Sequence, residues 1–335
     1  MNSTTWTQAT AALHERSLSP QTWPRSSGGG PDVGEPYLVT FLENILAFAS
    51  RLRKASPLDF QGEASVRGSA QAKAKANILV ADFQSLLNGP RQLITLNFPN
   101  HSFHPSIDAV MKALSDIVEM TDVDEHDLST LKARLKQLQS TLRRKSFLGR
   151  VGRHKLQASL RQQMFRRHFQ KLLVAHGHAR LHRFEVSYVP SQHRGFTPGK
   201  DMYEVVRSDW AALLSCLPSI FGSHLHGFAW QLDYTAEQGY RYFVAMLLSH
   251  DLGGATPEAD ALRQRWRDVT GGTGEYHDGR SHHLRSCRYR TSASHPWQSR
   301  DEVDTQINET AFFMSLPDAI VGFAPKGPQK PYGVG

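Results

Sequence analysis

The chain has only two cysteines, Cys216 and Cys287, among its 335 residues, so no disulfide framework is predicted. It also lacks any apolar run near the ~20 residues that a helix needs to cross a bilayer. Its first residues lack the basic start and apolar stretch of a secretory signal. These absences argue against a disulfide-rich secreted domain and a membrane-spanning protein, and they predict a cytoplasmic location.

Acidic residues are scarce over a long part of the chain. The formal net charge is +8, and between Thr141 and Lys200 the one acid is Glu185. The cations of that stretch are Arg143, Arg144, Lys145, Arg150, Arg153, Lys155, Arg161, Arg166, Arg167, Lys171, Arg180, Arg183, Arg194 and Lys200. A basic excess of this kind indicates a polyanionic partner, most simply nucleic acid.

The middle of the basic stretch has the period of an amphipathic helix. Its apolar side is formed by Leu156, Leu160, Met164, Phe165, Phe169, Leu172 and Leu173. Four cations fall largely off that side, and they are Arg161, Arg166, Arg167 and Lys171. A rigid row of long cationic side chains suits contact with phosphates. A solvated basic helix face is the alternative, and the pattern alone does not separate the two.

Three regions are expected along the chain. Residues 1–35 are poor in large apolar groups and predict a disordered tail. Residues 36–176 show helical periodicity and end in the basic helix, with Ser106 expected to cap one of the helices. Residues 177–335 predict a domain with a sheet, in which Pro218 ends a helix over 201–217.

A hairpin stands at the centre of this last region. Residues 224–233 alternate small or polar with bulky side chains, and residues 240–248 end in a continuous apolar run. Such a run indicates a strand buried on both faces. Gly239, in the connection, can adopt a positive φ.

Several motifs of this region resemble one family. The central pattern W-x-L-x-Y-x-x-x-x-G-Y rests on Trp230, Leu232, Tyr234, Gly239 and Tyr240. Glu185-Val186-Ser187-Tyr188 precedes it, and W-x-x-V-T-G-G-x-G-x-Y (residues 266–276) and the Gly-rich end, residues 331–335, follow it. Together, over about residues 180–335, they resemble the inovirus-type replication proteins and the related YagK/YfjJ C-terminal domains.

This resemblance implies an α+β fold with a ferredoxin-like or RRM-like antiparallel sheet. It also implies a HUH endonuclease of rolling-circle replication, in which two histidines hold a metal and a tyrosine attacks the phosphate. Here Arg241 and Phe243 stand at the histidine positions, and Phe312 or Phe313 stands at the tyrosine position. We therefore expect a DNA-binding protein of phage or prophage type with a degenerate centre, in which Arg241 can hold a phosphate. Arg263 and Arg267, displayed on a helix over residues 255–269, are further candidates for DNA contact.

Two alternatives keep other functions open. His224 and His226, with Glu185 or Gln231, have the spacing for a displaced metal pair, which would give an active nicking enzyme with Mg²⁺ or Mn²⁺. Two exposed histidines at a strand entrance are the simpler interpretation. The second alternative is a non-catalytic nucleic-acid-binding regulator of a mobile element.

One further cluster has metal-binding residue types. His277, His282, His283 and Cys287 could hold zinc, although their spacing fits no common zinc module. The other interpretation is a basic loop facing DNA or solvent.

Overall fold

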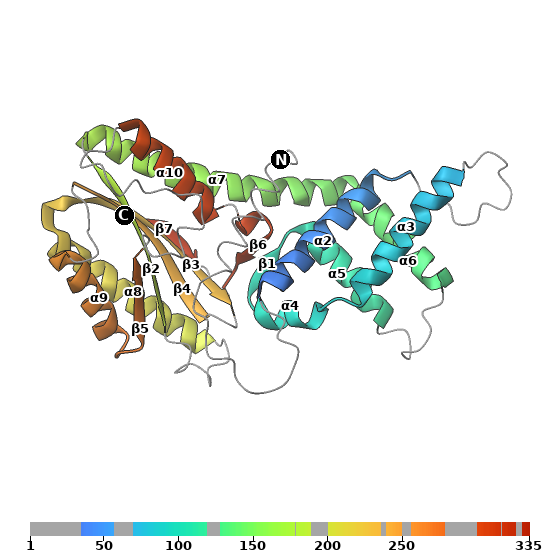
Figure 1. Cartoon of the computed structure of the whole chain (residues 1–335), viewed down its shortest axis with the longest axis horizontal. Coiled ribbons are helices and arrows are strands. Elements are labelled where there is room, and N and C mark those ends of the chain that lie inside the picture. The colour runs from blue at the N-terminus through green and yellow to red at the C-terminus, as the bar shows by residue number, and fades with distance from the viewer. Residues whose placement is uncertain are drawn as a thin grey trace. The chain divides into compact units, whose positions relative to one another are not determined.

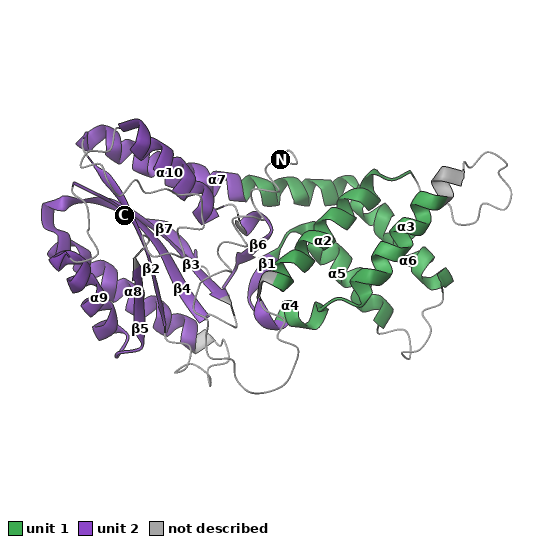
Figure 2. Ribbon diagram, in the orientation of Figure 1, with its two compact units in different colours: residues 1, 30–95, 103–157 green, residues 2–29, 96–102, 158–335 purple. Residues whose placement is uncertain are grey.

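The computed structural model describes residues 35–56, 70–118, 128–177, 179–188, 200–235, 239–249, 256–278, 300–315, 317–325 and 330–335. Two compact units divide them, as Figure 2 shows. The helical unit contains residues 30–95 and 103–157, and the sheet unit contains residues 96–102 and 158–335. The tail expected over residues 1–35 lies outside the described residues, except for Glu35, which begins a helix.

The helical unit is built from α2, α3, α5, α6, most of α4 and the first part of α7. Their bounds are α2 Glu35–Lys54, α3 Ala70–Leu87, α4 Arg91–Asn97, α5 Pro105–Val118, α6 Leu128–Arg143 and α7 Lys145–His176. The apolar residues that predicted these helices form the core, since Leu38, Ile45 and Leu135 are fully buried. Helical periodicity therefore indicated the helices of this unit, but the unit ends at residue 157 and not at the expected residue 176, because the second half of α7 packs on the sheet.

The start of α5 differs from the expected one. The helix begins at Pro105, and Ser106 lies in its first turn. The backbone carbonyl of His104 accepts from Ile107 N at 2.7 Å, and the His104 ring Nδ1 accepts from Ser106 N at 3.2 Å. The prediction that Ser106 caps the helix was wrong, because proline is well suited to the first helical position and the capping groups come from the residue before it.

The sheet unit alternates strands and helices. Its larger elements are β2 Arg180–Tyr188, α8 Lys200–Phe221, β3 Leu225–Thr235, β4 Gly239–Leu248, α9 Pro257–Val269, β5 Gly274–Asp278, α10 Arg300–Ser315 and β7 Tyr332–Val334. Two short strands, β1 His101–Phe103 and β6 Val321–Phe323, pair separately, and η2 Gly222–His224 and η3 Pro317–Ala319 are single 3-10 turns. Helices combined with antiparallel strands confirm the predicted α+β class.

The five-stranded sheet has the order β5-β2-β4-β3-β7, and all its neighbouring strands are antiparallel. The expected hairpin is β3 and β4, and Gly239 has a φ of 71° at its turn. Every residue of β4 after Gly239 is buried. The apolar run therefore correctly indicated a central strand covered on both faces.

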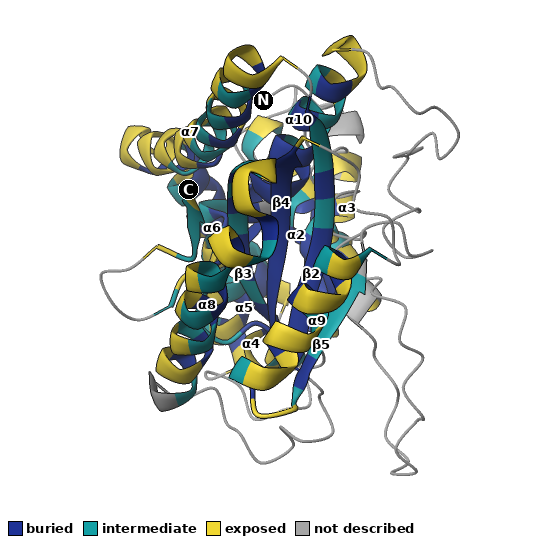
Figure 3. Ribbon diagram, turned by 90° about the vertical axis from the view of Figure 1, so that its left-hand side faces the viewer, coloured by how far each residue is buried: buried dark blue, intermediate teal, exposed yellow. Residues whose placement is uncertain are grey.

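Helices cover both faces of the sheet, on opposite sides in Figure 1. On the first face, Tyr242 and Val244 of β4 pack with Trp210 of α8 and Trp266 of α9. On the second face, Phe243, Ala245 and Leu247 of β4 pack with α7 and α10. The residues that these two helices contribute are Phe165, Phe169, Leu173, Val303, Ile307, Ala311, Phe313 and Met314. Figure 3 shows the central strand β4 buried and the outer sides of α8 and α9 exposed.

Helix α8 runs one turn further than expected, through Pro218 to Phe221. A proline removes one helical hydrogen bond and presses on the carbonyl four residues earlier, which matters little when a single turn remains. Gly222, with a φ of 56°, follows the last helical residue. The prediction that Pro218 ends this helix was wrong by one turn.

The edge strand β7 explains the glycines near the end of the chain. Trp230 of β3 pairs with Gly333, and Phe228 exchanges backbone hydrogen bonds with Gly335. A Cβ on Gly333 would lie 2.7 Å from Trp230 Nε1, and one on Gly335 would lie 2.4 Å from Phe228 Cζ. Glycine is needed at both positions because the aromatic rings of β3 lie across β7.

Candidate functional site

A row of polar side chains lies on the second face of the sheet, beneath α7 and α10. Register puts Glu185, Phe243 and Gln231 side by side on β2, β4 and β3. The next row on the same face is Ser187, Arg241 and Asp233. Glu185, Ser187, Gln231 and Arg241 are each at most 6% exposed. Because polar groups are costly to bury, such a cluster needs internal partners.

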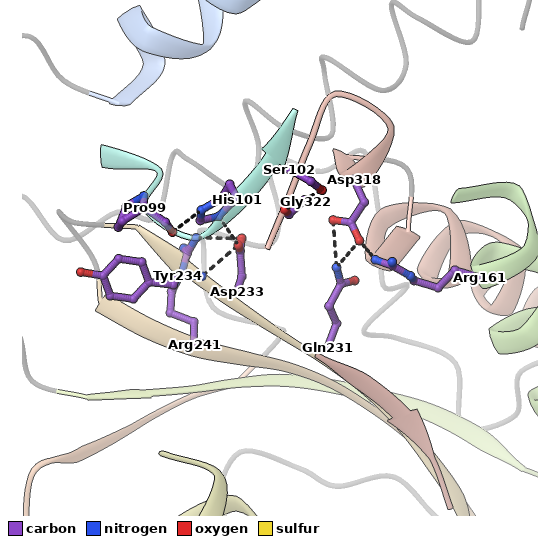
Figure 4. A network of polar contacts seen from close by, with 10 residues as sticks. All are labelled: Pro99, His101, Ser102, Arg161, Gln231, Asp233, Tyr234, Arg241, Asp318 and Gly322. Carbon is purple, nitrogen blue, oxygen red and sulfur yellow. Dashed lines mark hydrogen bonds and ion pairs between the residues drawn. The ribbon is translucent and has the colours of Figure 1, made fainter. Parts of the chain in front are cut away.

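Arg241 lies at the centre of the first group of contacts. Its Nη2 is 3.6 Å from Asp233 Oδ2, and the other oxygen of Asp233 is 3.6 Å from His101 Nε2 (Figure 4). His101 Nδ1 in turn lies 2.8 Å from the carbonyl of Pro99. The side chains of Arg241 and His101 are both 2% exposed. Arg241 is therefore a buried counter-ion of Asp233.

Asp318 lies at the centre of the second group. Gln231 Nε2 donates to both of its oxygens, at 3.1 and 2.9 Å, and Arg161 forms an ion pair with it. The Arg161 guanidinium carbon lies 4.2 Å from the centre of the Tyr332 ring. Asp318 thus joins α7, β3 and η3 inside the sheet unit (Figure 4).

The positions that the resemblance assigned to cleavage chemistry come together here. The rings of Phe243 and Phe313 are 5.6 Å apart and nearly perpendicular. Arg241 lies on the same face, 5.2 Å from the Phe243 ring. Phe313 of α10 is buried, whereas Phe312 is half-exposed. These three side chains offer neither a metal ligand nor a hydroxyl nucleophile.

The alternative metal pair is not assembled. His224 is exposed and its Nδ1 lies 2.7 Å from Ser249 Oγ, while His226 stacks on His176 with ring centres 3.9 Å apart. His226 occupies a bulge opposite the Leu248 end of β4, but Glu185 lies opposite Phe243. Phe243 and Leu248 are five positions apart on β4, which corresponds to about 16 Å at the usual rise of a strand. The structure therefore separates His224 and His226 from Glu185 and from Gln231.

The second cluster of metal-binding residue types is mostly outside the described residues, which include neither His282, His283 nor Cys287. His277 lies on β5, with its Nε2 3.5 Å from Glu275 Oε2 and 3.4 Å from Ser187 Oγ. In the part of the chain that the structure describes, no three His, Cys, Asp or Glu side chains are grouped to hold a metal ion.

The cations expected on α7 divide into two kinds. Arg166, Arg167 and Lys171 are exposed. Arg161 is turned inward, since its side chain is 16% exposed and pairs with Asp318. Helical periodicity put all four off the apolar side, but Arg161 is long enough to reach an acid contributed by a distant segment.

The cations expected on α9 also differ from one another. Arg263 is paired with Asp260 and lies 5.4 Å from the centre of the Tyr276 ring. Arg267 is exposed in the last turn of the helix. Helix α9 packs on the face of the sheet opposite α7, so Arg267 does not extend the surface formed by Arg166, Arg167 and Lys171.

No sequence signal pointed to His101, which lies beside Asp233, or to Asp318, which pairs with Arg161. Both come from segments far from β3 and β4 in the chain, and neither belongs to a recognisable motif. Asp233, by contrast, pairs with Arg241 across the hairpin, so the register of the two strands was sufficient to find it.

Comparison with known proteins adds no relative: no family model matches this chain, and neither a curated protein nor a solved structure gives a significant match. Among the described residues, no helix has the length and apolar character needed to cross a membrane.

Proposed function

We propose that this chain is a DNA-binding protein of the phage or prophage replication-initiator type, with a HUH-like centre that has lost the groups for cleavage. The observation that carries the proposal is the contact between Phe243 and Phe313 beside Arg241. The resemblance assigned these positions to the metal ligands and the nucleophile from sequence alone. Segments about 70 residues apart in the chain meet there, as a common catalytic centre would require.

The order of the strands supports a ferredoxin-like or RRM-like fold for the sheet unit. The succession β2-α8-β3-β4-α9-β5 is a β-α-β-β-α-β unit, and its strands lie in the order β5-β2-β4-β3. In RRM domains, bases stack on the open face of the sheet. Here α7 and α10 cover that face, so DNA must be contacted elsewhere on the unit.

The proposed DNA contact is the exposed row of Arg166, Arg167 and Lys171 on α7. These side chains are long and cationic and stand on a helix anchored by the buried Phe165 and Phe169. Such groups bind phosphates without reading bases, and each contact releases counter-ions. Binding of DNA by this protein weakens as the salt concentration rises. Because the centre has neither metal-binding histidines nor a tyrosine, the phosphodiester bond stays intact. A cytoplasmic location remains part of this proposal.

The test combines a cleavage assay and a binding assay on single-stranded hairpin DNA with Mn²⁺. We expect binding that weakens steeply between low and high salt, and no nicked product. The triple variant Arg166→Gln, Arg167→Gln and Lys171→Gln should lower the slope of log K against log salt by about 2, at ~0.7 for each phosphate of a single strand.

The matched control removes three charges elsewhere in the same unit, with Arg207→Gln, Arg300→Gln and Lys330→Gln. Its slope should stay that of the unmodified protein. Equal slopes for both triple variants would contradict a role for α7, and nicked DNA would contradict the degenerate centre.

A further inference from the structure

The helical unit carries a basic surface that the proposed function does not use. It lies where α6 ends and α7 begins, and Arg144, Lys145 and Arg153 are exposed there. No Asp or Glu occurs in the sequence between Asp127 and Glu185. Among the described residues, no acid forms an ion pair with any of these three. Arg150 lies near Asp108, because its charge opposes the rise that burial causes in the pKa of that carboxyl. Asp108 therefore partly neutralises Arg150, which does not belong to this surface.

One of these cations stands where the fold disfavours it. Lys145 is the first residue of α7, no acid lies in the first turn, and its side chain is exposed. The N-terminal end of a helix carries a partial positive charge, so a cation there is repelled and an anion is attracted. Arg144, by contrast, directly follows the last residue of α6, where the C-terminal end of that helix favours a cation. An external anion would relieve the repulsion at Lys145.

The glycines of the same helix provide a second observation. Gly149 and Gly152 lie inside α7, where glycine is unfavourable relative to alanine. A Cβ at either position would meet nothing within 4 Å, so packing inside the protein does not require them. At 3.6 residues a turn they share the exposed side of the helix with Lys145 and Arg153. Bare backbone between cations lets an extended phosphate chain approach closely.

We propose that Arg144, Lys145 and Arg153 form a second contact surface for DNA, which binds the phosphate backbone of a duplex through the helical unit. The proposal takes DNA as the ligand from the function proposed above. A duplex is favoured over a single strand because single-strand sites stack bases on aromatic rings, and the ring nearest this surface, Phe147, is buried. An anionic membrane is disfavoured because Phe147 and Val151 are buried, so that Leu148 is the one large apolar side chain exposed between residues 144 and 153.

The experiment measures binding of the full-length protein to a DNA duplex of random sequence over a series of salt concentrations. The triple variant Arg144→Gln, Lys145→Gln and Arg153→Gln should lower the slope of log K against log salt by about 2.7, at ~0.9 for each phosphate. The control is Lys54→Gln, Lys75→Gln and Lys112→Gln, three exposed cations on α2, α3 and α5 of the same unit. Its slope should not change.

A second variant tests the surface without removing charge. Gly149→Gln with Gly152→Gln fills open space in a helix, so it should fold at least as stably, and it should weaken duplex binding by holding the phosphates away. Unchanged affinity would count against a close backbone approach at this surface.

The outcomes separate this surface from the proposed function. If the duplex binds but the Arg144, Lys145, Arg153 variant keeps the full slope, the second surface is refuted and the proposed function stands. If both triple variants in the helical unit lower the slope equally, the surface is also refuted. If the protein binds no DNA but binds vesicles of phosphatidylserine, both proposals fail.

Discussion

Asp318 is the residue on which the buried contacts beneath α7 depend most. It accepts from Gln231 and pairs with Arg161, and its side chain is only 6% exposed. Asp318→Asn keeps the shape but leaves a largely buried guanidinium without its counter-charge. We expect the free energy of unfolding to fall by about 3 kcal/mol, as when one partner of a buried pair is removed. Urea unfolding of the variant checks this value.

The control for Asp318 is Arg167→Gln, which removes an exposed charge from the same helix as Arg161. Its stability should change by no more than about 0.5 kcal/mol. Similar losses in the two variants would mean that the buried ion pair of Arg161 and Asp318 contributes no more to stability than an exposed charge does.

His104 should make the stability of the helical unit depend on pH. Burial, followed by His154, Lys155 and Arg53, lowers its pKa to about 3 from 6.5. Because the pKa of His104 is lower in the folded chain, the unfolded chain binds a proton at a higher pH than the folded chain does. The stabilising contribution of neutral His104 is thus complete above pH 6.5 and is lost as pH falls from 6.5 toward 3, by about 1.4 kcal/mol for each pH unit.

The variant His104→Gln tests this dependence, because glutamine does not titrate and can still accept a hydrogen bond. Unfolding in urea at pH 7 and pH 5 should show a smaller loss of stability in the variant than in the unmodified protein. Parallel losses would mean that other groups cause the acid sensitivity.

Individual site residues were predictable where strand register alone decided their place. Alternation puts Arg241 and Phe243 on one face of their strand, and the observed hairpin register places Asp233, which was not predicted, opposite Arg241. The inward turn of Arg161 was not predictable, because its partner Asp318 lies more than 150 residues away and only the folded chain brings them together. The sequence indicated DNA contact by Arg161 and Arg241, and the structure shows both paired inside the fold.

At the scale of elements, β7 is an edge strand that packs against β3 only because glycines occupy two of the positions that face its aromatic rings. Gly333→Val would place a Cβ and two methyl groups against Trp230, which already lies 2.7 Å from the Cβ position. We expect a loss of about 1–3 kcal/mol from overpacking, with a change in tryptophan fluorescence as Trp230 moves. Unfolding monitored by fluorescence measures both.

The neighbouring Val334→Thr is the control for β7, because Val334 is 40% exposed and pairs in register with Ala229. Its stability should stay within about 0.5 kcal/mol of the unmodified protein. If Gly333→Val is equally harmless, β7 can shift to accommodate the side chain and the close approach is not required.

Elements were predictable in proportion to their length and periodicity. The bounds of helix α3, Ala70–Leu87, could be predicted from the sequence, because the run is Ala-rich and the following Asn88-Gly89-Pro90 ends a helix. Strands β5 and β7 were not predicted, since Gly274–Asp278 and Tyr332–Val334 are short and mixed in character. Their pairing with β2 and β3 is a tertiary contact that no local pattern encodes.

At the scale of the whole molecule, two facts about the sheet unit bear on function together. Helices α7 and α10 occupy the face on which an RRM-type sheet would meet nucleic acid. Beneath them, charges on Arg241 and Asp233 neutralise each other inside the fold. A protein of this construction can contact DNA only from its outer surfaces, where the exposed cations of α7 lie.

The proposed centre beside Phe243 and Phe313 lacks the groups that break a phosphodiester bond. The most direct measurement of this is a denaturing gel of the full-length protein incubated with labelled single-stranded hairpin DNA and Mn²⁺, which detects a covalent protein–DNA adduct. We expect intact oligonucleotide and no label on the protein, under salt conditions where binding is seen. Labelled protein, linked to the DNA through a tyrosine, would contradict it.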